Sequence, residues 1–231
     1  MRRTRAVVPA LAATLVVGLA GAAAARTGDH PAGQPAAARA PVAQVAAKTP
    51  GGPPPAATEP RIINASMAIP SIGIRSLAIV PYQGTTDDAP GTRIQDRGIA
   101  ASPFGPNGGV GPGQVGNYLV TGHRDSAGGP LHMVPSLKNG QQVVITAGGK
   151  VYTYKITQTR VTDFRSPSSL VEQRAAVPGF PGRTPTQAMI TVSTCATLED
   201  HAAGNFWHDA EDNPQHRIDK IGVLVSTRPA S

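Results

Sequence analysis

Two residues of the chain have the types and local settings expected of a nucleophile and its acid–base partner. Cys195 is the only cysteine among 231 residues, and it ends the strand-like run 191–194. His123 follows the strand-like run 118–121 and one glycine. The thiolate is the reactive form of cysteine, and a nearby imidazole is the usual group that generates it. The pair predicts nucleophilic catalysis by cysteine.

Each of these residues also has a plainer interpretation. One cysteine forms no disulfide within its own chain, so Cys195 is either a small buried apolar residue or a reactive thiol. A lone histidine such as His123 is more often a surface or core residue. The strand-end position of Cys195 favours the reactive thiol. Arg217 begins the next strand-like run, and its fixed planar donors suit a developing negative charge.

Together these residues resemble the sortases, the membrane-anchored cysteine transpeptidases of Gram-positive cell surfaces. Residues 191–195, Thr-Val-Ser-Thr-Cys, are similar to the sortase TLxTC motif with Val in place of Leu. Thr121-Gly-His123 is similar to the catalytic histidine motif, and Arg217 to the arginine on the last strand. The segment 116–124 is most similar to class E sortases of actinobacteria. The resemblance covers about residues 61–228.

The resemblance implies a reaction and a role for each residue. Cys195 attacks the carbonyl after Thr in a C-terminal sorting motif, of the LAxTG or LPxTG-like type, and forms a thioester. His123 protonates the departing amine and then activates the amine of a peptidoglycan precursor, such as a lipid II-like molecule. Arg217 and the backbone N–H of Ala196 hold the oxyanion. The partners implied are secreted proteins with C-terminal sorting signals.

Further residues have smaller implied roles. Thr121 and Thr194 provide supporting hydrogen bonds, and Tyr118 shapes the pocket for the motif's second residue, although a strand tyrosine is more often core. The sequence departs from the family in two places, an acidic insert at 199–213 and Thr197 where the family often has proline, and both lie in the loop between Cys195 and Arg217. Alternatives are a hydrolytic or pilin-polymerising sortase, or an inactive β-barrel that binds sorting peptides or cell wall.

The elements that must position these residues read as short strands. From residue 61 onward, apolar runs alternate with Gly, Pro and Asn, which predicts an all-β fold. Strand spacing alone leaves a barrel and a sandwich open, and the resemblance implies a closed eight-stranded β-barrel with one or two short helices. One helix is predicted after Ser166-Pro167 and one turn at 130–133. The strand candidates are 68–69, 74–79, 117–120, 142–146, 151–159, 188–194 and 218–225.

The chain divides into three segments by composition. Residues 1–25 join three arginines to twenty uncharged residues, which predicts an export signal or membrane anchor. Residues 26–60 contain ten Ala and eight Pro, typical of a disordered linker. Residues 61–231 form the catalytic domain. The expected location is the cell membrane, with a single N-terminal anchor retained and the domain outside the cell.

Charge and motif spacing exclude other classes of function. Residues 1–60 carry six basic and two acidic side chains, and the remainder fifteen and twelve, so the domain is only mildly basic. No nucleic-acid partner is expected. The carboxylates between Glu199 and Asp212 match no EF-hand spacing, and one cysteine completes no structural zinc site. We expect no metal and no cofactor.

Overall fold

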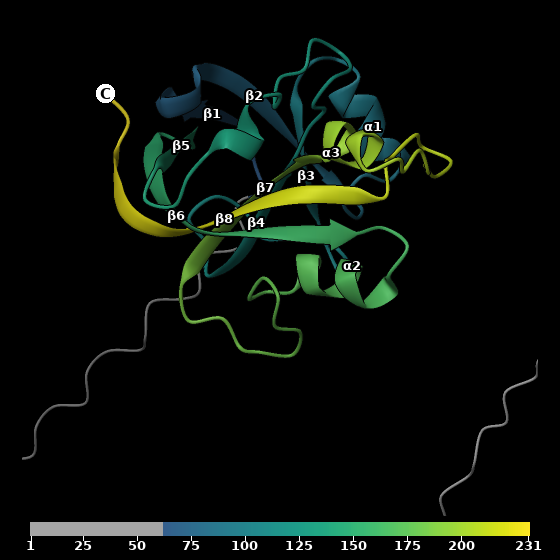
Figure 1. Cartoon of the computed structure of the whole chain (residues 1–231). Helices are drawn as coiled ribbons and strands as arrows, with labels where there is room; N and C mark the ends of the chain where they lie inside the picture. Colours follow the sequence, from purple (N-terminus) through teal and green to yellow (C-terminus); the bar gives the residue numbers. More distant parts are fainter. Residues whose placement is uncertain (1–61) are drawn as a thin grey trace, which may run out of the picture. The chain divides into compact units, whose positions relative to one another are not determined.

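The strands that follow residue 61 close into a barrel. The computed structural model describes residues 62–231, and its eight strands follow the order β1-β2-β3-β4-β7-β8-β6-β5 around the barrel (Figure 1). The predicted all-β fold and closed eight-stranded barrel are confirmed. The strands are β1 (Ala65–Ile69), β2 (Ile74–Gln83), β3 (Ala100–Phe104), β4 (Gly116–Thr121), β5 (Gln142–Ala147), β6 (Lys150–Asp163), β7 (Ala188–Cys195) and β8 (His216–Pro229).

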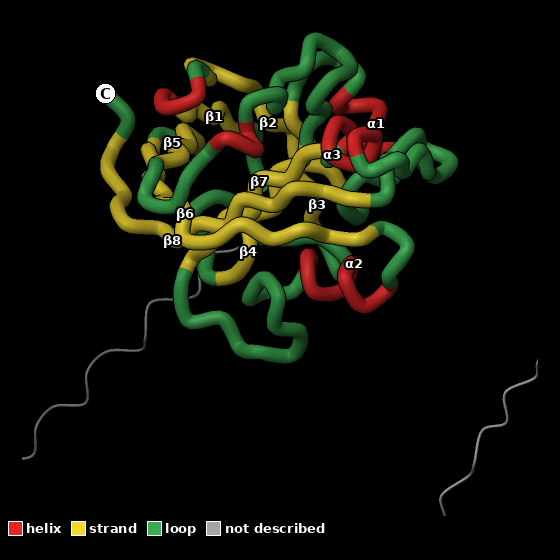
Figure 2. Tube along the Cα trace, viewed as in Figure 1, coloured by secondary structure: helices red, strands yellow, loops and turns green. Residues whose placement is uncertain are grey.

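Short helices connect the strands (Figure 2). The predicted helix is α2, where the Ser166 hydroxyl caps the first turn by accepting from the N–H of Ser169 at 3.3 Å. The turn predicted at 130–133 is present and leads directly into η2. The helices are η1 (Pro70–Ile72), α1 (Ala89–Gln95), η2 (Val134–Ser136), α2 (Pro167–Arg174) and α3 (Thr197–Ala202).

Four elements were not predicted from the sequence, and the shortest of them is the helix η1. Strand β3 has the sequence Ala-Ala-Ser-Pro-Phe, which lacks the β-branched alternation of a strand; it forms because β2 pairs with it in parallel. Helix α1 contains Pro and Gly, but the Asp88 carboxylate caps it by accepting from the N–H of Gly91 at 3.0 Å. Helix α3 lies in the acidic insert directly after Cys195.

The apolar core fills the inside of the barrel. Successive side chains of a strand point to opposite faces, so every second residue of a strand enters the core. On β7 these are Ile190 and Val192, which are fully buried with Met67, Ile145 and Tyr154 from other strands. Burial of such residues supplies the main stabilisation of the domain.

The strand order brings three chain segments to one end of the barrel. Strands β4 and β7 are parallel neighbours, with Thr121 opposite Ser193, so both strands finish at the same edge. Strand β8 is antiparallel to β7 and therefore begins at that edge, with Arg217 opposite Cys195. His123 leaves β4 two residues beyond its last residue. The topology explains why His123, Cys195 and Arg217 meet at this end, although His123 and Arg217 are 94 positions apart in the chain.

The predicted anchor, residues 1–25, and the predicted linker, residues 26–60, lie outside the described residues. Between residues 62 and 231, none of the helices is both long and apolar enough to cross a bilayer.

Candidate active site

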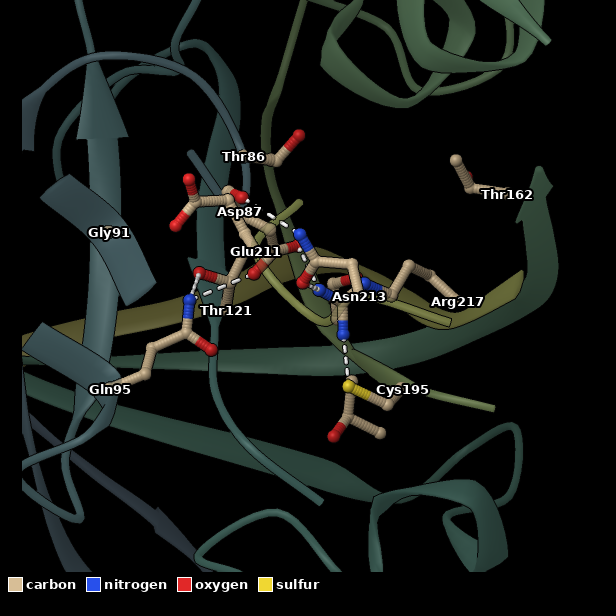
Figure 3. Close-up of polar contacts among 12 residues, drawn as sticks. Thr86, Asp87, Gly91, Gln95, Thr121, Thr162, Cys195, Glu211, Asn213 and Arg217 are labelled. Carbon is tan, nitrogen blue, oxygen red and sulfur yellow. Dashed lines mark hydrogen bonds and ion pairs between the residues drawn. The ribbon is translucent and has the colours of Figure 1, made fainter. Parts of the chain in front are cut away.

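Cys195 and Arg217 form the centre of the site. They are direct partners in the β7–β8 register, and Nη1 of Arg217 donates a hydrogen bond to the Cys195 sulfur (Figure 3). Cys195 is only 9% exposed, and Arg217 is 2% exposed. The guanidinium is therefore placed to stabilise negative charge on the sulfur or on an oxygen bonded next to it.

Arg217 is held in the interior by groups from three segments. Its Nη2 lies 3.0 Å from Oδ2 of Asp87, which is equally buried, and it also donates to Oδ1 of Asn213. The guanidinium carbon lies 5.0 Å from the centre of the Phe164 ring. Burial lowers the pKa of Arg217, but the negative charges of Asp87 and Cys195 outweigh it, and the net shift is upward. Arg217 thus stays charged although it is buried.

His123 completes the group of three from the end of β4. Gly122 before it lets Leu131 approach closely, since a Cβ at Gly122 would lie 2.8 Å from Leu131 Cδ1. The imidazole Nε2 lies 2.9 Å from Oδ1 of Asp96, and the side chain is 15% exposed. The pKa of His123 is raised, chiefly by a hydrogen bond with Cys195 and also by Asp96, against the opposing effect of burial.

A cavity opens over the sulfur and the imidazole. Its volume is about 600 Å³, and it is walled by the start of the β4–η2 loop on one side and by the acidic insert on the other. Phe206 and Trp207 of the insert contribute aromatic surface to it. The other lining residues are Thr92, Asp96, His123, Arg124, Asp125, Ser126, Cys195, Thr197, His201, His208, Glu211, Asp212, Asn213 and Pro214. The cavity is large enough for an extended peptide segment of a few residues.

An ion pair fixes the wall of this cavity to the strand end. The guanidinium of Arg124, the residue after His123, donates through two nitrogens to the Glu199 carboxylate of α3. The same guanidinium donates to the backbone carbonyl of Cys195 at 3.3 Å. The segments that carry the histidine and the cysteine are therefore joined directly, and Arg124 is 6% exposed.

The residues predicted to support the site lie in different places. Thr194 donates to the carbonyl of Gly122 at 3.0 Å, which ties the cysteine strand to the histidine loop. Thr121 accepts from Nε2 of Gln95 at 3.1 Å. Tyr118 is 2% exposed and packs in the barrel core, away from the cavity lining. The structure therefore gives Tyr118 no contact with the proposed substrate pocket.

The backbone N–H of Ala196, the second oxyanion donor that the resemblance implies, is engaged within the sheet in this structure. Its backbone N–H donates to the carbonyl of His216 at 2.9 Å, which continues the β7–β8 pairing by one residue. Ala196 is 3% exposed, so the amide points into the sheet and not into the cavity. Next to Cys195, the guanidinium of Arg217 remains as a side-chain donor that could hold an oxyanion.

Sequence reasoning missed the carboxylates and amides that surround the three residues. Asp87, Asp96 and Gln95 come from the β2–α1 loop and from α1, a helix that the sequence did not predict. Asn213 lies at the end of the acidic insert. The one available signal was Asp87-Asp88 before Pro90, a helix N-cap pattern. Pattern alone cannot say which of two adjacent aspartates turns inward.

The chemistry available to the site follows from these contacts. A thiol that contacts a guanidinium can attack a carbonyl carbon, and a neighbouring imidazole of raised pKa can protonate the leaving group. Of residues 62–231, no three His, Cys, Asp or Glu side chains gather in a way that could hold a metal ion. The site is built for acyl transfer through sulfur.

The comparisons with known proteins agree with this geometry. The Sortase domain family model matches residues 67–211. Sortase E from Streptomyces avermitilis is 26% identical over 71% of this chain and 89% of that chain, with a TM-score of 0.52. The SrtA sortase from Actinomyces oris is 19% identical over 74% and 84% of the two chains, with a TM-score of 0.55.

A third solved structure, sortase E1 from Streptomyces coelicolor with a tripeptide in its active site, is 23% identical. It covers 72% of this chain and 90% of that chain, with a TM-score of 0.54. A comparison with curated protein sequences finds no match. Because the family model spans more than half of the chain, and the barrel carries the cysteine, histidine and arginine together at one end, this protein belongs to the sortase family and is a cysteine transpeptidase.

Proposed function

We propose that this sortase cleaves a C-terminal sorting motif of the LAxTG or LPxTG-like type after its Thr residue. It then joins the new carboxyl end to an amine of a peptidoglycan precursor. The observation that carries the proposal is the convergence of Cys195, His123 and Arg217 at one end of the barrel, next to a cavity of about 600 Å³. The resemblance of residues 116–124 to class E sortases implies the LAxTG form of the motif, and the likeness to sortase E of Streptomyces avermitilis agrees with that class.

The first half-reaction forms a thioester. The sulfur of Cys195 attacks the threonine carbonyl, and the carbonyl oxygen becomes an oxyanion within reach of Nη1 of Arg217. His123, as imidazolium, gives its proton to the nitrogen of the departing glycine, and the C–N bond breaks. The raised pKa of His123 increases the imidazolium fraction at neutral pH, which supports this role.

The second half-reaction transfers the acyl group. Neutral His123 takes a proton from the incoming amine, which attacks the thioester carbonyl, and Cys195 leaves as thiolate paired with Arg217. The amine must reach the thioester faster than water does. The insert and the β4–η2 loop enclose the cavity on two sides, and this enclosure limits the access of water.

The cellular setting forms part of the same proposal. Residues 1–25 would anchor the chain in the cell membrane, and residues 26–60 would space the catalytic domain from its surface. The catalytic domain would then act outside the cell on secreted proteins as they emerge. The peptidoglycan precursor, which is itself held at the membrane, would meet the thioester there.

The test uses the full-length protein, an LAxTG peptide and an amine. Mass spectrometry of the products after incubation with triglycine or diaminopimelate should find the peptide cleaved after Thr and joined to the amine. Cleavage should fall about a hundredfold or more in Arg217→Ala, because one oxyanion donor is worth about 2.7–4 kcal/mol. His123→Ala should lose a similar factor.

Each alternative gives a different product. Cleavage without amine incorporation would indicate a hydrolytic enzyme, and joining only to a lysine-containing pilin peptide would indicate a polymerising one. No cleavage, with Cys195 protected from iodoacetamide in the folded protein, would contradict the enzymatic proposal and favour a binding module. Thr157→Ala is a suitable comparison, because Thr157 donates to the backbone carbonyl of Ile221 at 3.3 Å and contacts none of the three central side chains.

A further inference from the structure

The guanidinium of Arg217 is fixed on the side away from the sulfur. Nη1 donates to Cys195, whereas Nη2 donates to Oδ1 of Asn213 and lies 3.0 Å from Oδ2 of Asp87 (Figure 3). These two partners come from the acidic insert and from the β2–α1 loop, far apart in sequence. An arginine side chain has many rotamers, so partners on one nitrogen decide where the other nitrogen points.

Asp87 is itself held firmly. It is 4% exposed and has a φ of 57°, in the left-handed region that Asp and Asn tolerate better than most residues. Its Oδ1 accepts from Nε2 of Gln95 at 2.8 Å, and the same amide nitrogen donates to Thr121 of β4 at 3.1 Å. The carboxylate is thus tied to the barrel before it meets Arg217.

Asn213 is held by the insert. Asp209 accepts from the backbone N–H of Asn213 at 2.9 Å and from its Nδ2 at 3.0 Å. The same Nδ2 donates to the backbone carbonyl of Asp87 at 3.1 Å, so Asn213 and Asp87 contact each other as well as the arginine. Because Nδ2 of Asn213 donates to two acceptors, Oδ1 is left facing Arg217. Asn213 as a whole is 5% exposed.

We propose that Asn213 and Asp87 are positioning residues that lock Nη2 of Arg217, so that Nη1 is directed at the Cys195 sulfur and at the oxyanion formed next to it. This inference rests on the proposed role of Arg217 and extends it. It also assigns a purpose to the acidic insert: through Asp209 the insert presents Asn213, and the reactivity of Cys195 depends on the insert being in place.

A purely structural role for the same contacts is the competing explanation. Buried arginine needs an opposite charge in any case, and Asp87 supplies it. The two explanations differ in what happens to the sulfur. If the contacts only stabilise the fold, a folded variant keeps its thiol reactivity; if they direct Nη1, the thiolate loses its partner and reacts more slowly at neutral pH.

The main experiment measures the rate of Cys195 alkylation by iodoacetamide in the full-length protein. The chain has one cysteine, so the measurement reports a single site and needs no peptide substrate. In Asn213→Ala we expect the rate at neutral pH to fall roughly tenfold, the value of one hydrogen bond to a charged group, and the pH–rate profile to move to higher pH. Both Asn and Ala are uncharged, so the substitution leaves the charge of the site unchanged.

The matched control is Asn205→Ala. Asn205 lies in the same insert and donates to the side chain of Gln215 at 3.0 Å, but it has no contact with Arg217. Its alkylation rate should stay within about twofold of the unmodified protein. Equal rates in Asn213→Ala, Asn205→Ala and the unmodified protein would overturn the proposal.

A second variant, Asp87→Gly, separates positioning from charge. Glycine adopts the φ of 57° without strain, so the substitution removes only the carboxylate. Loss of a nearby negative charge would by itself favour the thiolate and speed alkylation, whereas loss of positioning slows it. Slower alkylation supports the proposal, and faster alkylation contradicts it for Asp87. This variant also serves if Asn213→Ala fails to fold, as judged by its thermal unfolding.

A double-mutant cycle tests whether Asn213 acts through Arg217. If Asn213 acts through the arginine, Asn213→Ala should slow alkylation by less than about twofold in an Arg217→Ala background. An equal loss in both backgrounds would show that Asn213 acts on the fold and not through Arg217. A protein that passes this cycle but cleaves no sorting peptide would retain the positioning inference and lose the proposed substrate.

Discussion

The two faces of strand β7 have opposite chemistry. The inner face carries Ile190 and Val192, which are fully buried among the apolar side chains of the barrel. The outer face carries Thr191, Ser193 and Cys195, which are also buried but contact polar groups or the cavity. One strand of eight residues therefore supports both the core and the reactive centre.

The outer face is covered by a polar layer, not by solvent. Gln173 of α2 donates to Ser193 at 3.2 Å and to Asp219 of β8 at 3.0 Å, and it accepts from Thr86 at 2.9 Å. Thr162 of β6 donates to the second oxygen of Asp219 at 2.6 Å. Packing inside the barrel thus provides most of the stability, while the polar layer outside it joins α2, β6 and β8 to the strand that ends in Cys195.

The largest expected effect is on activity, and it comes from replacing Cys195 on the outer face of β7. Cys195→Ala should abolish thioester formation, a loss of more than about a thousandfold, because a thioester needs a thiol and Cys195 is the one cysteine of the chain. Its thermal unfolding midpoint should change little, since the substitution removes one sulfur atom at the edge of the cavity. A large drop in stability would place Cys195 in the core and contradict the comparison.

A substitution on the inner face of β7 should have the opposite effect, a loss of stability without a loss of thiol reactivity. Ile190→Ala should lower the free energy of unfolding by about 2–5 kcal/mol, because it leaves a cavity in a close-packed interior. Its alkylation rate at Cys195 should remain near that of the unmodified protein while the barrel is folded. Chemical denaturation, followed by alkylation below the transition, measures both quantities. Reduced thiol reactivity in the folded variant would mean that the two faces are coupled.

A smaller effect is expected in the polar layer. Gln173→Ala should cost about 1–3 kcal/mol, because it removes a donor from the buried carboxylate of Asp219. Burial raises the pKa of Asp219, and hydrogen bonds from Ser193, Thr162 and Gln173 lower it in part.

The pH dependence of this variant has a definite sign. An acid whose folded pKa exceeds its unfolded pKa contributes stability that is complete below the unfolded pKa and lost as pH rises through the folded pKa. Removing Gln173 raises the folded pKa of Asp219 further. The destabilisation should therefore be larger at neutral pH than in mild acid, and unfolding curves at the two pH values measure the difference. The reverse order would indicate that Asp219 is not the group affected.

The smallest expected effect concerns Asp96, which contacts His123 from the C-terminal cap of α1. Asp96→Asn removes a charge that raises the pKa of His123, so the imidazolium should lose its proton at lower pH. The basic limb of the cleavage pH profile should move to lower pH, and the effect is small because the Asp96 side chain is 59% exposed and solvent screens its charge. Asp125→Asn is the control, since Asp125 lines the same cavity but contacts His132.

The sequence predicted much of the fold because most strands have strong local patterns. Strands such as β6 and β7 are rich in β-branched and aromatic residues and were found by their pattern. Strand β3 was missed because small residues such as Ala100 and Ala101 carry no pattern, and only pairing with β2 and β4 makes them a strand. Helix α1 was missed for a different reason: the Pro and Gly at its start argue against a helix, but the cap at Asp88 outweighs them.

By itself, the sequence determined the chemical identity of the site: a single thiol, a histidine after a strand and an arginine in the next strand are local features that a chain displays in order. The tertiary structure decided what surrounds them. It turned the Ala196 amide into the sheet, placed Tyr118 in the core, and brought Asp87 and Asn213 onto Arg217. These outcomes depend on contacts between residues far apart in the chain, and a local sequence pattern does not determine which distant residues come into contact.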